Sequence, residues 1–159
     1  MIFLRIAGAV LLTLSGMVAA YVVNSAESAA LSQTEGIIAF IRLCRVRIDC
    51  FSLPIGEILR SCEKKELSVC GYTGSIPPRD LAELVLGCRI SDAAAHKLFS
   101  DFASEFGRGY RDEQLKACDY YLSMLEDHRQ KLVESLPAKR KRNGAICVCA
   151  SLALAILLL

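Results

Sequence analysis

Eight cysteines and two histidines give this 159-residue chain its widest chemical repertoire. Thiolates and imidazoles can hold zinc, and paired cysteines can form disulfides or redox couples. No two cysteines have the two-residue gap typical of such motifs; they occupy positions 44, 50, 62, 70, 88, 118, 147 and 149. Several fall at core-like positions of predicted helices, where a free cysteine packs as a small apolar residue. The spacing favours buried thiols in a reducing compartment, with a disulfide framework and a metal site as alternatives.

No catalytic constellation accompanies these residues in the sequence. His128 follows Glu126 and Asp127, but close neighbours along a helix do not face one another. His96 could meet Ser100 one turn later without making a triad.

Glu57 is the remaining catalytic candidate, yet an acidic residue in the first turn of a helix is expected on dipole grounds alone. A glycine-rich phosphate loop, a nucleophile elbow and a paired-histidine metalloprotease motif do not occur in the sequence. We therefore expect no enzymatic activity, no metal or cofactor and no small-molecule substrate.

The two ends of the chain are uncharged and apolar. Residues 6–23 carry no charge after Arg5, and residues 144–159 carry none after a basic run. That run consists of Lys139, Arg140, Lys141 and Arg142. A basic collar beside an apolar segment is typical of a membrane helix whose charged side stays in the cytoplasm. We expect a short N-terminus at residues 1–5, transmembrane helices at 6–23 and 144–159, and a cytoplasmic helical domain at 24–143.

A cleaved signal peptide is the alternative for the first segment. Ala19 and Ala20 could support cleavage, which would export a disulfide-stabilised domain held by its C-terminal tail. The apolar run is longer than a typical signal core, so an uncleaved anchor is favoured. Gly16 with Ala20, and Ala145 with Cys149, have the small-residue spacing that allows close helix contact or merely reflects membrane composition.

The central segment has a balanced charge, which gives no footprint for nucleic acid. Its apolar periodicity predicts an all-α fold, a helical bundle of about five to six helices between an N-terminal and a C-terminal transmembrane helix. The first helix from Ala29 carries the stripe Ile37, Ile41, Cys44 and Ile48 and breaks at 51–53. Two further helices are predicted at 54–67 and 78–90, with a loop over 70–78 between them. A fourth helix is predicted to be capped by Ser91 and ended by Gly107, and a fifth covers 111–136 and stops before Pro137.

Two stretches of the sequence carry a family resemblance. The first is Arg47 to Leu59 (RIDCFSLPIGEIL) and the second is Phe102 to Gln114 (FASEFGRGYRDEQ). Together with both apolar ends, they resemble the stage III sporulation protein AB family of endospore-forming Firmicutes. The matching positions are Pro54, Ile55 and Glu57 in the first motif and Phe102, Gly107 and Gln114 in the second. Ala103, Phe106 and Tyr110 stand where the family usually has glycine, leucine and aspartate.

The resemblance implies a fold and a function beyond what the residues give. The family's soluble domain is similar to the helical cytoplasmic domains of the type II secretion F platform protein. Members belong to a membrane complex between mother cell and forespore that acts as a specialised secretion or feeding channel. The resemblance implies an integral protein of the mother-cell-derived forespore membrane, with its partners among the other stage III sporulation proteins, including the cytoplasmic ATPase of the complex. A general type II secretion or pilus assembly platform shares the fold and is the remaining alternative.

Overall fold

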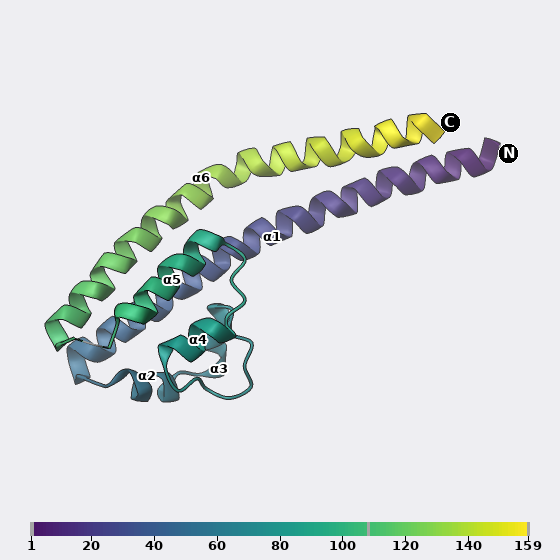
Figure 1. The fold of residues 1–159 in the computed structure, drawn as a ribbon. Coiled ribbons are helices and arrows are strands. Elements are labelled where there is room, and N and C mark those ends of the chain that lie inside the picture. Colours follow the sequence, from purple (N-terminus) through teal and green to yellow (C-terminus); the bar gives the residue numbers. More distant parts are fainter. Residues whose placement is uncertain (1, 108, 159) are drawn as a thin grey trace. The chain divides into compact units, whose positions relative to one another are not determined.

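Two long helices and four short ones form the chain, as the computed structural model in Figure 1 shows. The structure describes residues 2–107 and 109–158, without the side chains of residues 2–7, 9, 10, 12, 155, 157 and 158. The helices are α1 (Ile2–Phe51), α2 (Ile55–Ser61), α3 (Lys64–Val69), α4 (Leu81–Gly87), α5 (Ala93–Glu105) and α6 (Arg111–Leu158). The described residues contain no strand, only an isolated bridge between Tyr72 and Cys88. The all-helical class predicted from the sequence is confirmed.

The helices form two compact units. Unit 1 consists of Met1–Ser28 and Val133–Leu159, and unit 2 of Ala29–Leu132. Both long helices therefore contribute one part to each unit.

In unit 2, α1 and α6 run antiparallel, and α5 packs against both of them (Figure 1). The predicted stripe of α1 forms the core, since Ile37, Ile41 and Cys44 are fully buried and Ile48 is 3% exposed. Opposite it, α6 buries Cys118, Tyr121, Leu122, Leu125 and Leu132 at near-heptad spacing. Long-range ion pairs align the two helices, among them Arg42 with Glu126 at 2.6 Å and Arg129 with Glu35 at 2.8 Å.

Three of the short helices, α3, α4 and α5, begin where a side chain satisfies free backbone N–H groups. Asp80 accepts a hydrogen bond from the Glu83 N–H at the start of α4, and Asp92 accepts one from the Ala95 N–H at the start of α5. At α3, Glu63 and Glu66 form a reciprocal capping box, in which Glu66 accepts from the Glu63 N–H at 2.9 Å.

Three element boundaries differ from the sequence-based expectation. The helix expected over 54–67 is two helices, because Cys62 is extended and Glu63 starts a new one. The helix expected over 78–90 is confined to Leu81–Gly87, and α5 is capped by Asp92 instead of Ser91.

A fourth difference concerns Pro137, which lies inside α6 instead of ending a helix. Proline removes one backbone hydrogen bond from a helix interior. The turn after it is held to α1 by Lys139, whose ammonium lies 2.8 Å from Glu27, and by Arg140, which donates to the Ser28 hydroxyl. These contacts within unit 1 offset the loss.

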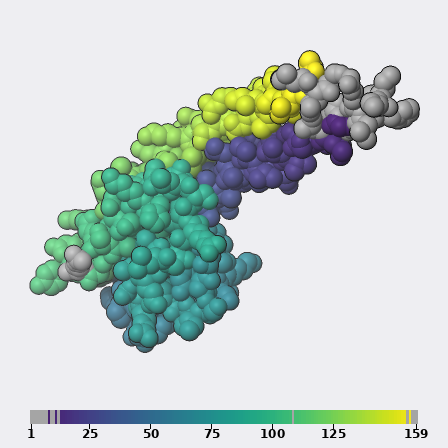
Figure 2. Space-filling model, turned by 45° about the vertical axis from the view of Figure 1, so that its right-hand side comes forward, coloured from purple at the N-terminus to yellow at the C-terminus, as the bar shows by residue number. Residues whose placement is uncertain are grey.

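Unit 1 is a close antiparallel pair of the two helix ends, whose side chains pack along each other in Figure 2. A Cβ on Gly16 would lie 2.6 Å from Ser151 Oγ and 3.0 Å from the Cys147 carbonyl oxygen. The close contact expected from small residues therefore forms through Gly16, Cys147 and Ser151, while Cys149 is exposed.

Apolar side chains also cover the outside of unit 1. Leu11, Val18 and Tyr21 are 68%, 62% and 75% exposed on α1, and Ile146 and Ile156 are 60% and 68% exposed on α6. Within the described residues, no helix is long and apolar enough to cross a membrane. Both predicted spans include residues whose side chains the structure does not describe. These are 6, 7, 9, 10 and 12 in the first span and 155 and 157–159 in the second.

Candidate functional site

The two sequence motifs, far apart along the chain, meet at one end of unit 2. Gly107 ends α5 with φ +87°, a left-handed conformation that glycine adopts without strain, as predicted. A Cβ on Gly107 would lie 3.9 Å from Ile55 Cγ2, which is ordinary van der Waals contact. Ile55 is the first residue of α2, where the Pro54 carbonyl accepts hydrogen bonds from the Glu57 and Ile58 N–H groups. We call this region the motif end.

Aromatic packing fixes the α5 side of the motif end. The ring of Phe102 is fully buried, with centroids 4.7 Å from Phe106 and 5.7 Å from Tyr121 of α6. The Tyr121 hydroxyl donates to Glu105 Oε2 at 2.9 Å. Burial and this hydrogen bond raise the pKa of Tyr121 to about 12, so its hydroxyl stays protonated at neutral pH. Phe102 and Phe106 are therefore core residues that position the end of α5.

The start of α6 is fixed by three side chains. Glu113 accepts a hydrogen bond from the Tyr110 N–H, and Gln114 Nε2 donates to the Gly109 carbonyl at 2.8 Å. Arg111 donates to the backbone carbonyl of Asp49 at 2.8 Å and to its carboxylate at 2.5 Å. Gln114 thus holds the turn between α5 and α6, and Arg111 joins that turn to the last turn of α1.

An open groove of about 590 Å³ lies at the motif end, between the end of α5 and the start of α6. Its lining combines two carboxylates with small and amide side chains: Ser104, Glu105, Phe106, Gly109, Glu113, Gln114 and Ala117. Exposed aromatic rings lie on the two helix ends that Arg111 joins, with Tyr110 86% exposed and Phe51 70% exposed. Aromatic side chains around an acidic depression are suited to docking a protein partner.

Other motif residues lie outside this groove. Glu57 is exposed on the first turn of α2, and Pro54 is exposed before it. Within the described residues, no group of three or more histidine, cysteine, aspartate or glutamate side chains is arranged to hold a metal ion.

Sequence reasoning missed a polar link between α5 and α6. His128 Nε2 lies 2.8 Å from Asp92 Oδ1, and both side chains are about one-fifth exposed. Burial acts to raise the pKa of Asp92, but hydrogen bonds from the Ala95 N–H and from His128 outweigh it, so that the pKa is lowered. The sequence predicted Ser91 as the cap of α5, whereas in the structure Asp92 both accepts from the Ala95 N–H and contacts His128.

The cysteines lie mostly inside unit 2, as free thiols. Cys44, Cys62, Cys70, Cys88 and Cys118 are buried, and Cys50 is exposed. Burial raises the pKa of Cys88 to about 11 and that of Cys118 to about 12. Such thiols are protonated and unreactive at neutral pH, so they act as core residues.

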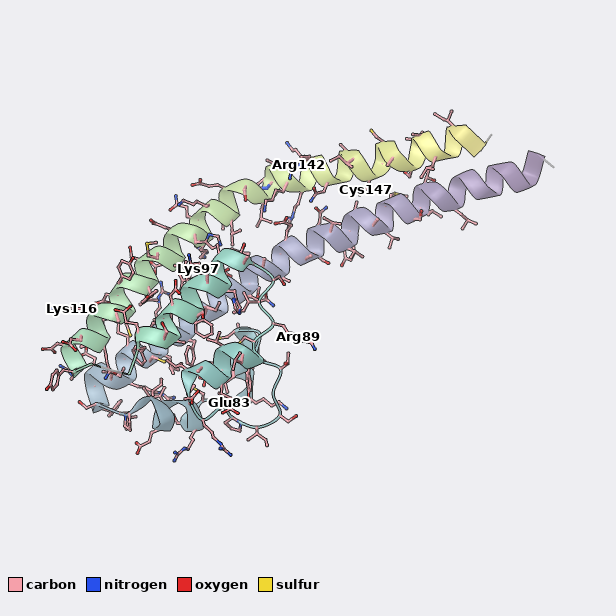
Figure 3. The ribbon with its side chains drawn as sticks, in the orientation of Figure 1. Glu83, Arg89, Lys97, Lys116, Arg142 and Cys147 are labelled. Carbon is pink, nitrogen blue, oxygen red and sulfur yellow. The ribbon has the colours of Figure 1, made fainter. Side chains whose placement is uncertain are left out.

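The basic run lies on α6 in unit 1. Lys139 pairs with Glu27, Arg140 binds Ser28, and Lys141 and Arg142 are exposed. Figure 3 labels Arg142 at this level and Cys147 further along the apolar end.

Comparison of the chain with protein-family models, curated proteins and solved structures gave no match.

Proposed function

We propose that this chain is a non-enzymatic platform subunit, anchored in a membrane by both ends, that presents unit 2 to other proteins in the cytoplasm. The best-fitting complex is the stage III sporulation complex between mother cell and forespore, on the strength of the two sequence motifs. Its partners there would include the cytoplasmic ATPase of that complex. The observation that carries the proposal is the approach of Ile55 to Gly107, which brings two distant sequence motifs next to each other.

Membrane attachment is supported by the surface of unit 1. Exposed leucine, valine and isoleucine side chains surround both helix ends. Exposing this much apolar surface to water costs free energy, which burial in a lipid bilayer would remove. The exposed cations Lys141 and Arg142 come directly before the uncharged stretch, where lipid headgroups would meet them. Pairing of Lys139 with Glu27 neutralises the charges that lie between the two helices.

A docking role is supported by the make-up of the motif end. Its core side, around Phe102 and Phe106, is rigidly packed, and its outer side exposes Tyr110 beside the groove. A surface that is already ordered loses little conformational entropy on binding. Glu105 and Glu113 would favour a partner segment with positive charge.

The gene in its source organism provides the direct test. Deletion is expected to stop spore formation after engulfment, measured as the yield of heat-resistant spores and by microscopy. A wild-type copy should restore the yield. Normal spore yield in the deletion strain would refute the sporulation assignment.

Complementation with groove variants tests the docking surface itself. Ala117→Arg places a long cation in the groove, whereas Ala82→Arg makes the same change at an exposed site on α4. With both variants accumulating to the wild-type level, only Ala82→Arg is expected to restore spores. Equal restoration by both would show that the groove is not a docking site.

Two measurements separate the alternatives. For an exported protein released by signal cleavage, the intact mass from membranes would lack the N-terminal segment and the cysteines would resist thiol labelling. For a general secretion or pilus platform, pilin genes would lie beside this gene, and deletion would abolish secretion or piliation without affecting spores.

A further inference from the structure

A second surface of unit 2, which begins further along α2 from Ile55, combines positive charge with an exposed apolar side chain. It lies where α2 meets the loop before α4, and its groove of about 450 Å³ is lined by Arg60, Ile76, Pro77, Pro78 and Arg79. The walls of this groove are almost entirely apolar. We call it the cationic corner.

The loop of the cationic corner is held in place from both sides. The Tyr72 hydroxyl donates to the Ile76 carbonyl at 2.7 Å, and Pro78 is fully buried. Gly74 wraps closely over Tyr72, since a Cβ there would lie 2.3 Å from the Tyr72 hydroxyl. Ile76 is nevertheless 77% exposed. The loop is therefore held in one conformation while it exposes a large apolar side chain. A preorganised apolar side chain of this kind is suited to anchoring a binding partner.

The arginines of the cationic corner differ from those that join α1 to α6. Arg42, Arg45 and Arg129 form ion pairs with carboxylates, whereas Arg47 donates to the Ser61 hydroxyl. Among the residues that the structure describes, no carboxylate pairs with the guanidinium of Arg60 or Arg79. Both arginines lie near Gly56 of α2, because a Cβ there would lie 4.0 Å from Arg60 Nη2 and 3.8 Å from the Arg79 carbonyl oxygen.

Acidic residues near the corner are directed elsewhere. Glu83, labelled on α4 in Figure 3, accepts a hydrogen bond from the Arg79 backbone N–H at 2.7 Å. Asp80 caps α4, and Glu63 and Glu66 cap α3. Glu57 is exposed on α2, where it remains the one nearby carboxylate without such a bond among the described contacts. Among the described contacts, the guanidinium groups of Arg60 and Arg79, which belong to residues that line the groove, therefore have no carboxylate partner.

We propose that the cationic corner binds an acidic segment of a partner protein, with Arg60 and Arg79 contacting its carboxylates and Ile76 packing against an apolar side chain between them. Guanidinium groups form bidentate hydrogen bonds with carboxylates, and the apolar wall lowers the local dielectric around them. This surface is distinct from the groove at the motif end, which is lined by the carboxylates of Glu105 and Glu113, and it does not depend on how the ends of the chain are anchored.

Fluorescence anisotropy of a labelled peptide, in which two glutamate pairs flank one leucine, tests the site on the full chain in mild detergent. The double variant Arg60→Glu/Arg79→Glu is expected to weaken binding about tenfold or more, since each exposed charge pair contributes up to about 1 kcal/mol. Ile76→Ser should weaken binding without changing its salt dependence. Circular dichroism confirms that each variant is folded.

The matched control is Lys97→Glu/Lys116→Glu, which changes the net charge equally on α5 and α6, away from the corner (Figure 3). It is expected to leave the affinity within about twofold, because screening limits the effect of distant charges. Equal weakening by both double variants, or no saturable binding to the wild-type chain, would overturn the proposal.

Photo-crosslinking in the source cells identifies the natural partner segment. With p-benzoylphenylalanine at position 76, a crosslinked peptide from another protein that is rich in aspartate and glutamate supports the proposal. A crosslink to lipid, to a second copy of this chain or to a neutral or basic peptide overturns it, as does the absence of any crosslink.

Discussion

Replacing Gly107 with alanine should destabilise unit 2 through the backbone alone. Gly107 has φ +87°, where an L-residue with a Cβ is strained by roughly 1–2 kcal/mol. A steric clash does not add to this strain, since the nearest atom to a new Cβ would be Ile55 Cγ2 at 3.9 Å. Alanine also lowers the entropy of the unfolded chain, which returns about 0.4–1 kcal/mol. The expected net loss is about 1 kcal/mol.

Two further substitutions separate backbone strain from other effects. Gly107→Asn should lose less than Gly107→Ala, because asparagine visits the left-handed region more readily. Gly56 is helical, and a Cβ there would make only ordinary contacts at 3.8 Å and beyond. Gly56→Ala should therefore stabilise by about 0.5–1 kcal/mol.

Thermal unfolding of the full chain, followed by circular dichroism in mild detergent, measures these differences. For a domain of this size, 1 kcal/mol corresponds to about 4–8 °C in Tm. Gly107→Ala is expected to lower Tm and Gly56→Ala to raise it. If Gly107→Ala raised Tm as well, the left-handed turn between α5 and α6 would be wrong, and with it the meeting of the two motifs.

Three other results are expected. Gly36→Ala should destabilise unit 2 although alanine has the higher helix propensity, because the new Cβ would lie 2.4 Å from the Val69 carbonyl oxygen. Overpacking of this kind costs about 1–3 kcal/mol of folding free energy. A raised Tm would refute the close contact. Asp92→Ala should cost about 1 kcal/mol at neutral pH by removing the cap and the link to His128. Because the pKa of Asp92 is lowered in the folded state, the stabilisation by its carboxylate is present above the unfolded pKa and is lost as the pH falls below about 4. The Tm of the variant should therefore fall less steeply with decreasing pH than the Tm of the wild type. An equally steep fall in Tm would contradict the pairing. Within unit 2, maleimide should label Cys50 in the native chain before any buried thiol, as peptide mapping would show, and rapid labelling of the core cysteines would disprove their burial.

The core of unit 2 could be predicted from the sequence because its pattern is local and periodic. The stripe on α1 and the near-heptad on α6 identify their buried faces at helical spacing, as Ile41 and Leu125 illustrate with no exposure at all. The end of α5 at Gly107 was equally readable, since glycine directly after an apolar helix face favours a left-handed cap.

Boundaries set by distant residues could not be predicted in this way. Ser91 and Asp92 are both good capping residues, and the choice between them depends on His128, which the fold brings to Asp92. Pro137 is a local helix breaker, yet α6 continues through it because contacts such as Lys139 with Glu27 hold the next turn.

The groove at the motif end was also beyond sequence reasoning. The motif residues were recognised one by one, but their common role required the approach of Ile55 to Gly107 and the bond from Arg111 to Asp49. Both contacts join segments far apart in the chain, and no periodic pattern encodes them. Glu57 belongs to the first motif but is exposed on α2 and does not line this groove, so membership in a sequence motif does not by itself place a residue at the site.

The charges of unit 2 fall into two groups with different physical consequences. The pairs along α1 and α6 are at least one-third exposed, so each contributes at most about 1 kcal/mol, and their main effect is to set the antiparallel register. Arg60 and Arg79 lack such partners in the described part of the chain, so they contribute nothing of this kind to the fold. Under the two proposals made above, the groove lined by Glu105 and Glu113 and the corner lined by Arg60 and Arg79 would take partner segments of opposite charge.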